Sequence, residues 1–254
     1  MIPLGPRTLF EKEVRRFLRV PGQTLLSPLI TTVLYLVVFG YALGNAMREV
    51  HGVPYVAFIV PGLIMLGVIS NSFLNTSSSF FMMKMQETIV DLLVSPLTYT
   101  QIVAAMVSAA TVRAILVGIL TWIVAVIAQG ELNVPHPFFA LAFPILTSIG
   151  FAALGLFTAI WAEKFEQVNF VPTFVITPLT FLGGVFYDVE RLPGFFASLS
   201  QLNPILYVVE GMRYGLIGNS SVDPWVGLGF LVVFDAAAVA LCLFVLRKGW
   251  KLRG

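Results

Sequence analysis

The chain has 254 residues, of which 58% are hydrophobic and only 11% are charged, and its formal net charge is +2. A soluble domain of this length needs a far more polar surface, so the composition excludes an ordinary soluble protein and indicates an integral membrane protein. The single cysteine, Cys242, excludes a disulfide within the chain and a cysteine-based metal site.

The first segment predicts a helix along the membrane surface, at about residues 6–20. Apolar Phe10, Val14 and Phe17 recur at helical spacing, while the basic residues fall largely elsewhere on the helical wheel. Such a helix places its apolar side in the membrane interface and its basic side toward anionic lipid. An unstructured basic segment is the alternative. No apolar core with a cleavage site follows, so a cleavable signal peptide is not expected.

Six stretches are long and apolar enough to cross a bilayer, which takes about 20 residues. They cover about residues 25–44, 56–80, 101–128, 138–162, 168–187 and 224–246. The fifth contains Pro172 and Pro178, which membrane helices tolerate when neighbouring groups satisfy the freed carbonyls. We therefore expect an all-α membrane protein, with residues 1–254 forming a single transmembrane domain.

Basic residues near both ends predict that the N- and C-termini lie in the cytoplasm. The terminal basic residues are Arg7, Lys12, Arg15, Arg16 and Arg19, then Arg247, Lys248, Lys251 and Arg253. The expected loops add Lys84 and Lys164 inside, against Arg48, Arg191 and Arg213 outside. Two ends on one side require an even number of crossings, and six crossings satisfy this condition.

A short cytoplasmic helix is expected at residues 86–94, where the chain leaves the second span and before Ser95-Pro96 ends the helix. One side of it is apolar and the other is acidic. The candidate docking residues are Gln86, Glu87, Ile89, Asp91, Leu92 and Leu93. A short, partly apolar helix exposed to the cytoplasm is typical of a docking surface for a partner. A simple turn between two spans is the alternative.

Arg113 lies near the middle of the third expected span, where an arginine costs about 2.5–3.5 kcal/mol on insertion scales. It should therefore face the bundle interior and find partners there. Asp235, in the last span, lies at a depth that differs by only about 4 Å at the helical rise. We expect the two residues to form an intramembrane ion pair. The alternatives are that Arg113 bonds backbone carbonyls, snorkels, or meets an anionic head group of a cargo.

The segment at residues 191–217 is apolar but broken at Asn203-Pro204. A single extra crossing here would move the basic C-terminal tail to the outside. We therefore expect a re-entrant hairpin of two short helices, which enters the membrane from the outer side and returns. Irregular backbone at membrane depth must be covered by protein or face a wet cavity, so this hairpin should pack on other helices or on a second subunit. A lipid-facing interfacial hairpin is the alternative.

Catalytic motifs are absent from the sequence. It has no GxxxxGK[ST] phosphate loop and not even a Gly-Lys dipeptide, so ATP hydrolysis through a P-loop is not expected. It has neither HExxH nor GxSxG. His51 and His136 lie far apart and have no ligand spacing. The chain itself is therefore expected to hold no cofactor, no metal and no catalytic residue.

Motifs between residues 171 and 215 carry a family resemblance. They comprise a proline-bearing span, a glycine pair, a Leu-Pro, a Leu-Asn-Pro and a helical arginine. They are Thr177-Pro178-Leu179, Phe181, Gly183-Gly184, Leu192-Pro193, Leu202-Asn203-Pro204 and Arg213. Residues 55–73, with Pro61-Gly62, add a second match. The chain resembles, nearly end to end, the permease subunit of ABC-2-type ATP-binding-cassette transporters, in the branch of drug, lipid and lipo-oligosaccharide exporters.

The resemblance implies a bacterial inner-membrane permease that works as a dimer on two cytoplasmic P-loop ATPase subunits. ATP and Mg²⁺ would bind to those partners, and no nucleic acid is involved. The resemblance makes residues 86–94 the coupling helix that docks on the ATPase, and it places the dimer contact and the path mainly along the first, second and fifth spans. It also implies an outer gate made by Gly183, Gly184, Tyr187, Pro193, Asn203, Pro204 and Arg213. Asp235 belongs to no pattern of the family.

Few polar residues lie within the spans, which favours a lipid-like, amphipathic or drug-like cargo. The candidates along the path are Thr31, Asn71, Asn75 and Thr76. Ordinary hydrogen bonding between helices is the alternative role for them. A secondary transporter or channel that acts without an ATPase is the alternative function. Such a transporter or channel is expected to have an internal repeat or a charged path through the membrane, and the sequence has neither.

Overall fold

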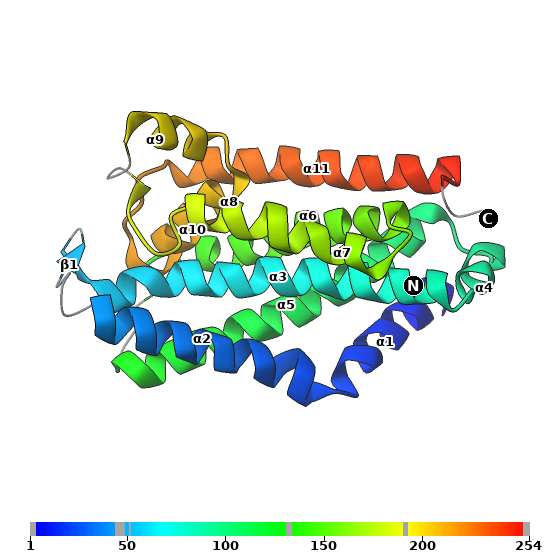
Figure 1. The fold of residues 1–254 in the computed structure, drawn as a ribbon, viewed down its shortest axis with the longest axis horizontal. Coiled ribbons are helices and arrows are strands. Elements are labelled where there is room, and N and C mark those ends of the chain that lie inside the picture. Colours follow the sequence, from blue (N-terminus) through cyan, green and yellow to red (C-terminus); the bar gives the residue numbers. More distant parts are fainter. Residues whose placement is uncertain (1–3, 44–48, 51, 131–133, 190–192, 251–254) are drawn as a thin grey trace.

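The apolar segments form helices because a bilayer offers no water to the backbone, so each N–H and C=O group must bond within its own segment. Figure 1 shows the computed structural model, in which the long helices lie side by side along one axis. It describes residues 4–43, 49–50, 52–130, 134–189 and 193–250. Among the predicted features, Gly44, residues 191–192 and four of the basic residues fall outside these ranges. The four are Arg48, Arg191, Lys251 and Arg253.

Helices make up nearly all of the described chain, which confirms the all-α membrane fold. In order, the elements are α1 (Leu4–Leu18), η1 (Gly22–Leu26), α2 (Ser27–Val37), η2 (Val38–Leu43), β1 (Glu49–Val50), β2 (Val53–Pro54), α3 (Tyr55–Met85), α4 (Ile89–Val94), α5 (Tyr99–Gln129), α6 (Pro137–Trp161), α7 (Phe165–Val171), η3 (Pro172–Ile176), α8 (Thr177–Leu182), α9 (Gly194–Gln201), α10 (Pro204–Ile217) and α11 (Pro224–Lys248). The η elements are π-helical turns, and β1 and β2 form a small antiparallel hairpin.

Within the described ranges, five helical stretches are long and apolar enough to cross a membrane. They are Gly22–Gly40, Tyr55–Met85, Tyr99–Ala128, Pro137–Trp161 and Pro224–Lys248. Each coincides with one of the six predicted spans. The remaining predicted span, at residues 168–187, is not among these five, so the number of crossings stays a prediction.

That remaining segment is helical in three consecutive pieces, α7, η3 and α8. Pro172 and Pro178 lack the N–H groups that a regular helix needs, and the chain widens into the π-helical turn between them. The Pro172 carbonyl accepts from both the backbone N–H and the Oγ1 of Thr177, the latter at 2.9 Å. The helix ends before Gly184, whose φ of +74° turns the chain.

The helices differ strongly in how much of their surface the protein covers. α3 lies at the centre, packed against α5, α6 and α10, and 78% of its most apolar window is buried. The first membrane-length stretch, Gly22–Gly40, lies at the edge with only 17% of its window buried. α3 and α5 have 31 residues each, which is about 46 Å and longer than the bilayer core of about 30 Å.

The two ends of the bundle carry different elements. Both chain ends and α4 lie at one end, whereas β1, α9 and α10 lie at the other (Figure 1). We call these the α4 end and the α10 end. α1 packs on α5, and its Leu9 and Phe17 are buried in the protein. The predicted apolar side of α1 thus contacts the bundle itself, and the expected membrane surface is not its only neighbour.

The predicted break at Asn203-Pro204 separates α9 from α10. Asn203 accepts a hydrogen bond from the Ile205 N–H at 3.0 Å and donates through Nδ2 to the Leu179 carbonyl at 2.5 Å. It therefore begins α10 and also ties it to α8. α10 is largely buried against α3, α6 and α11, while α9 exposes Phe195 and Phe196. The two halves of the expected hairpin thus have opposite environments.

Candidate functional site

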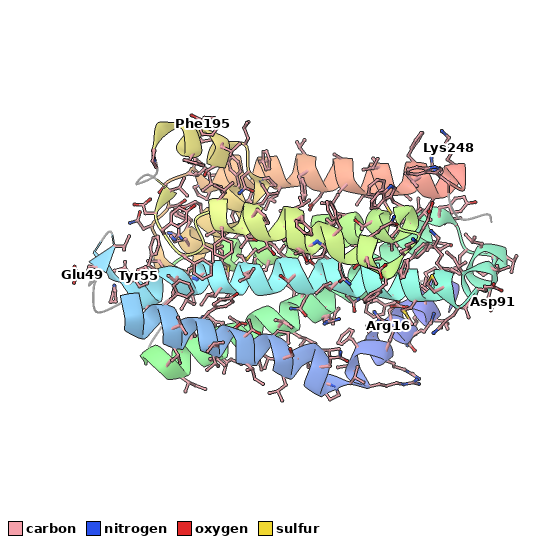
Figure 2. All side chains as sticks on the ribbon, viewed as in Figure 1. Arg16, Glu49, Tyr55, Asp91, Phe195 and Lys248 are labelled. Carbon is pink, nitrogen blue, oxygen red and sulfur yellow. The ribbon has the colours of Figure 1, made fainter. Side chains whose placement is uncertain are left out.

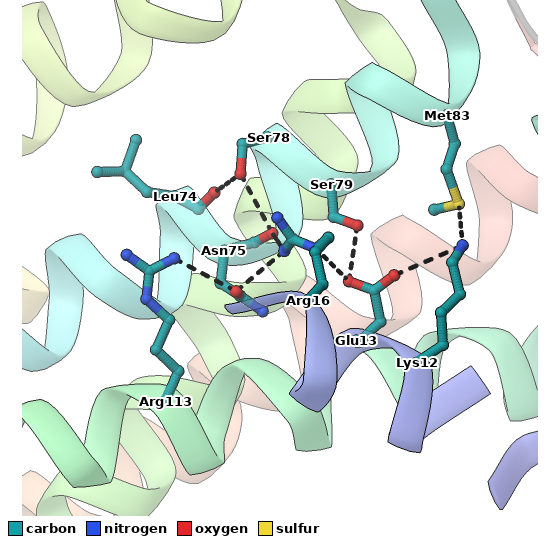
Figure 3. A network of polar contacts seen from close by, with 9 residues as sticks. All are labelled: Lys12, Glu13, Arg16, Leu74, Asn75, Ser78, Ser79, Met83 and Arg113. Carbon is teal, nitrogen blue, oxygen red and sulfur yellow. Dashed lines mark hydrogen bonds and ion pairs between the residues drawn. The ribbon is translucent and has the colours of Figure 1, made fainter. Parts of the chain in front are cut away.

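A connected group of polar side chains joins α1, α3 and α5, near the start of the Gly22–Gly40 stretch (Figure 3). We call it the inner polar cluster, and its members are Glu13, Arg16, Asn71, Asn75, Ser79 and Arg113. Its α3 members recur every four residues, so helical geometry places them on one face of α3. Glu13 and Arg16 share one face of α1 for the same reason.

Asn75 is the junction of this cluster. Its Oδ1 accepts hydrogen bonds from Arg16 Nη2 at 3.0 Å and from Arg113 Nη1 at 3.4 Å. Arg16 also bonds the Asn75 carbonyl at 3.0 Å. The Arg113 Nη2 donates to Asn71 Oδ1 at 3.0 Å. A single side chain of α3 therefore joins α1 to α5.

Glu13 is the only carboxylate in the inner polar cluster, and it is 1% exposed. Its Oε2 accepts from Ser79 Oγ at 2.6 Å and from Arg16 Nε at 3.1 Å. Two arginines thus face one carboxylate, and Arg113 bonds only neutral amide oxygens among the described residues. The cluster carries a surplus positive charge.

The predicted ion pair between Arg113 and Asp235 is not formed in this structure. Arg113 faces the amides of α3, whereas Asp235 lies on α11 beside Gly150 of α6. Neither carboxylate oxygen of Asp235 has a hydrogen-bond partner in the described part of the chain. The prediction rested on matching depth, and depth does not fix where two residues lie around the bundle.

A pocket of about 260 Å³ opens beside the inner polar cluster, between α2, α3 and α5. Thr31, Asn71 and Arg113 all line it, so the structure brings two of the predicted path residues together with the arginine. Asn75 lies one turn further along α3. Thr76 points elsewhere, because its Oγ1 donates to the Ala152 carbonyl of α6 at 2.7 Å. For Thr76 the geometry is that of an ordinary bond between helices.

The predicted coupling helix forms as α4, at the tip of the turn between α3 and α5. It begins at Ile89, so Gln86 and Glu87 lie in the preceding turn, where Glu87 has a φ of +60°. Ile89 is buried in the bundle, and Leu92 and Leu93 are half-buried against the same core. Asp91 is exposed at the α4 end in Figure 2.

The exposed face of α4 differs from the apolar side predicted from sequence. Val90 and Val94 are 55% and 77% exposed, and they flank Asp91 in the helix. Ile89 anchors the helix from the opposite side. A hollow of about 840 Å³ separates α4 from α1 and is lined by Lys12 and Asp91, among others. A partner that approaches this end would therefore meet two valines, a carboxylate and an adjacent recess.

A second buried charge lies at the α10 end, where we define the outer polar cluster as Glu210, Arg213, Ser220, Ser221 and the Gly184 carbonyl. Arg213 forms an ion pair with Glu210 and donates to the Gly184 carbonyl at 2.9 Å. Its guanidinium also lies 3.9 Å from the centre of the Phe58 ring. The Ser221 N–H donates to Glu210 Oε2 at 2.8 Å.

Two of the seven predicted outer-gate residues, Gly184 and Arg213, belong to the outer polar cluster. Gly183 packs against Ile205, Tyr187 is half-buried against the core, and Pro193 is exposed before α9. Asn203 and Pro204 begin α10, and Arg213 lies within it. The structure thus places Gly184 and Arg213 in direct contact.

The carboxylates of both clusters, Glu13 and Glu210, are not among the residues predicted from the sequence. Glu210 stands three residues before Arg213, which is a spacing at which helical side chains meet. Glu13 stands between Phe10 and Phe17 on the apolar side of the predicted surface helix. A carboxylate on an apolar face was the available signal for a buried partner.

Comparisons with known proteins agree with this architecture, which is that of a transport permease. Residues 7–217 match the ABC-2 type transporter family. The chain is 41% identical over 247 residues to the inner membrane transport permease YadH of Escherichia coli strain K12, covering 97% of this chain and 96% of that protein. It is 28% identical over 231 residues to nodulation protein J of Rhizobium meliloti strain 1021, covering 91% and 88%.

The chain therefore belongs to the ABC-2 type transporter family. It is a multi-pass permease of the inner membrane, and the family implies association with ATPase subunits. The resemblance inferred from the motifs between residues 171 and 215 is confirmed.

Proposed function

We propose that this permease is the membrane-spanning part of an ATP-driven exporter. A second copy of the chain completes the translocation path, and two separate cytoplasmic P-loop ATPase subunits drive it. ATP and Mg²⁺ bind to those ATPase subunits. The observation that carries the proposal is α4, a short helix with an exposed face that is anchored to the bundle by the buried Ile89.

Its position suits α4 for receiving motion from a partner. It joins α3 to α5, the two longest helices, so a force on α4 reaches both of them. Both chain ends lie at this same end of the bundle (Figure 1), and basic termini mark the cytoplasmic side. Closure of the two ATPases would displace α4, tilt α3 and α5, and change access to the path as packed helices slide.

The exposed edge of the bundle supports the second copy. α2 leaves Ile30 and Leu34 61% and 58% exposed, and Phe174 of η3 is 64% exposed. These elements belong to the first and fifth predicted spans, where the family resemblance places the dimer contact. In the proposed dimer, the polar pocket between α2, α3 and α5 lies next to the path, which favours a lipid-like or amphipathic cargo.

The docking role of α4 predicts that Asp91→Lys weakens capture of the cognate ATPase. The substitution reverses the charge at the centre of the exposed face, and binding depends on the charges of the two surfaces being complementary. We expect about tenfold weaker association and a matching loss of permease-dependent ATPase activity. Copurification from membranes and ATP hydrolysis by the purified complex measure both effects.

The matched control is Glu49→Lys, which makes the same charge change at the opposite end of the bundle (Figure 2). Glu49 is exposed in the β1–β2 hairpin, and ATPase capture should be unaffected there. If Asp91→Lys binds and stimulates the ATPase as strongly as Glu49→Lys does, α4 is not the docking element. If no ATPase copurifies with the unaltered chain, the proposed source of energy is wrong.

A further inference from the structure

The pocket beside Arg113 has the chemistry of an anion site. Arginine carries five N–H donors, and two of those of Arg113 go to Asn71 and Asn75. Arg113 is half-buried and lines the pocket together with the hydroxyl-bearing Ser27 and Thr31, and its Nε has no hydrogen-bond partner among the described residues. A cation with spare donors, flanked by hydroxyls and an amide, favours an anion with several acceptor oxygens.

The pocket lies at the depth of lipid head groups, not at the centre of the membrane. The Gly22–Gly40 stretch has 19 residues, which is about 28 Å of helix and close to the thickness of the bilayer core. Arg113 and Arg16 bond the same Asn75 oxygen, and Arg16 lies six residues before this stretch begins. At the other end of the stretch, Gly40 lies against Val56, at the beginning of α3. Arg113 is therefore level with the edge of the core on the side of α1.

On α3, the polar lining residues Ser70 and Asn71 lie nearer to the α4 end than the apolar Leu63 and Leu66 do. Asn71 lies at the level of Arg113, while Leu66 and then Leu63 follow along α3 toward the α10 end. An amphipath in the leaflet on the side of α1 has the same order, with its charged group at the edge and its chains toward the centre. Because α2 leaves most of its surface uncovered, such a molecule can reach the pocket from the bilayer.

We propose that this pocket binds the anionic head group of an amphipathic molecule from the leaflet on the side of α1, with a phosphate-type group on Arg113. A volume of about 260 Å³ holds a head group and the start of its chains. The inference deepens the proposed export function, because it gives the cargo class a negative charge and a side of entry. Binding of the head group does not depend on the proposed export function. Only the conclusion that the bound molecule is exported rests on it.

Native mass spectrometry of the purified permease tests the binding directly and without an ATPase. The probes are phosphatidylglycerol, diacylglycerol and inorganic phosphate, each titrated onto delipidated protein. Diacylglycerol has the same chains but no phosphate, so we expect the protein to retain phosphatidylglycerol about tenfold more strongly, as one charge-assisted contact supplies. Inorganic phosphate should compete weakly, because it lacks the chains that the leucines contact. If phosphate competes as well as the anionic lipid does, the site is for a free anion and the lipid proposal fails.

Three variants test whether the preference for phosphatidylglycerol originates at Arg113 and its pocket. Arg113→Gln should abolish it, and Arg113→Lys should keep part of it. Thr31→Trp fills the pocket from an exposed position and leaves every bond of the inner polar cluster in place, so it should also lower lipid retention. It keeps the test valid if Arg113→Gln fails to fold.

The matched control is Arg19→Gln, which removes one exposed positive charge just beyond the end of α1 and outside the pocket. Its preference for the anionic lipid should equal that of the unaltered chain. If Arg19→Gln loses as much preference as Arg113→Gln, the attraction is a general surface effect and the proposed site is wrong. Because no ATPase is present, this outcome is separate from a failure of ATPase coupling.

Discussion

Arg213 and Arg113 are two arginines of one helical bundle, and the protein surrounds them differently. Arg213 is 4% exposed, is paired with Glu210, and lies against the Phe58 ring. Arg113 bonds two neutral amides and borders a pocket that also contains hydroxyl groups. Each arginine lines a pocket that also has serine or threonine hydroxyls, and each has a buried Nε without a hydrogen-bond partner among the described residues, so the difference between them is the countercharge that Arg213 has and Arg113 lacks. A charge that its own chain neutralises stabilises the structure, whereas the role proposed for Arg113 is to receive an anion.

The largest expected effect comes from Arg213→Gln in the outer polar cluster. The change leaves Glu210 charged, 1% exposed and without its ion-pair partner. Breaking a buried pair from one side costs about 3–5 kcal/mol. Yield and thermal unfolding of the purified protein in detergent measure this loss. Arg213→Lys keeps the charge, so its stability should lie between that of the unaltered protein and that of Arg213→Gln. An Arg213→Gln protein as stable as the unaltered one would mean that the pair contributes no stability.

A smaller loss of stability is expected from Glu13→Gln in the inner polar cluster. Arg16 then loses its charged partner, but it is 36% exposed and can bond water instead. Hydrogen bonds to charged groups contribute about 1.5–3 kcal/mol, so the loss should lie below that of Arg213→Gln. The same unfolding measurement tests this order.

A double-mutant cycle with Ser79→Ala shows whether the Glu13 contact itself is responsible for that loss. Ser79 donates to Glu13 at 2.6 Å, so the two changes together should cost less than the sum of their separate effects. Additive losses would indicate that the Ser79 bond does not contribute to the effect. If Glu13→Gln costs more than Arg213→Gln, the contrast between the two clusters fails.

The smallest effect is expected from Arg7→Ala on the exposed side of α1. Arg7 pairs with Glu11 at 2.8 Å, but the two side chains are 66% and 40% exposed. An exposed pair one helical turn apart contributes about 0.3–0.5 kcal/mol. Unfolding should therefore be nearly unchanged, which sets the baseline for the two clusters. A loss as large as that of Glu13→Gln would show that α1 depends on its surface charges as much as on the buried carboxylate.

Patterns along the sequence predicted the features that depend on residues close together in the chain. Apolar length located the five membrane-length helices, and Asn203-Pro204 marked the break between α9 and α10. The same information could not choose the partner of Arg113, because helices at equal depth can lie on opposite sides of a bundle. Nor could it orient α4, since the side chains that anchor a short helix depend on what lies beneath it. Ile89 is buried there while Val90 and Val94 point outward.

The excess length of α3 and α5 over the bilayer has a mechanical consequence. About 16 Å of each helix extends beyond a core of about 30 Å, and α4 joins the two projecting ends. The bonds from Arg16 and Arg113 to Asn75 connect α1, α3 and α5 near the level at which the two long helices leave the core. Asn75 therefore lies where α3 and α5 would pivot against each other. In the proposed mechanism, a force on α4 would turn the long helices about the point beside which the pocket of Arg113 lies.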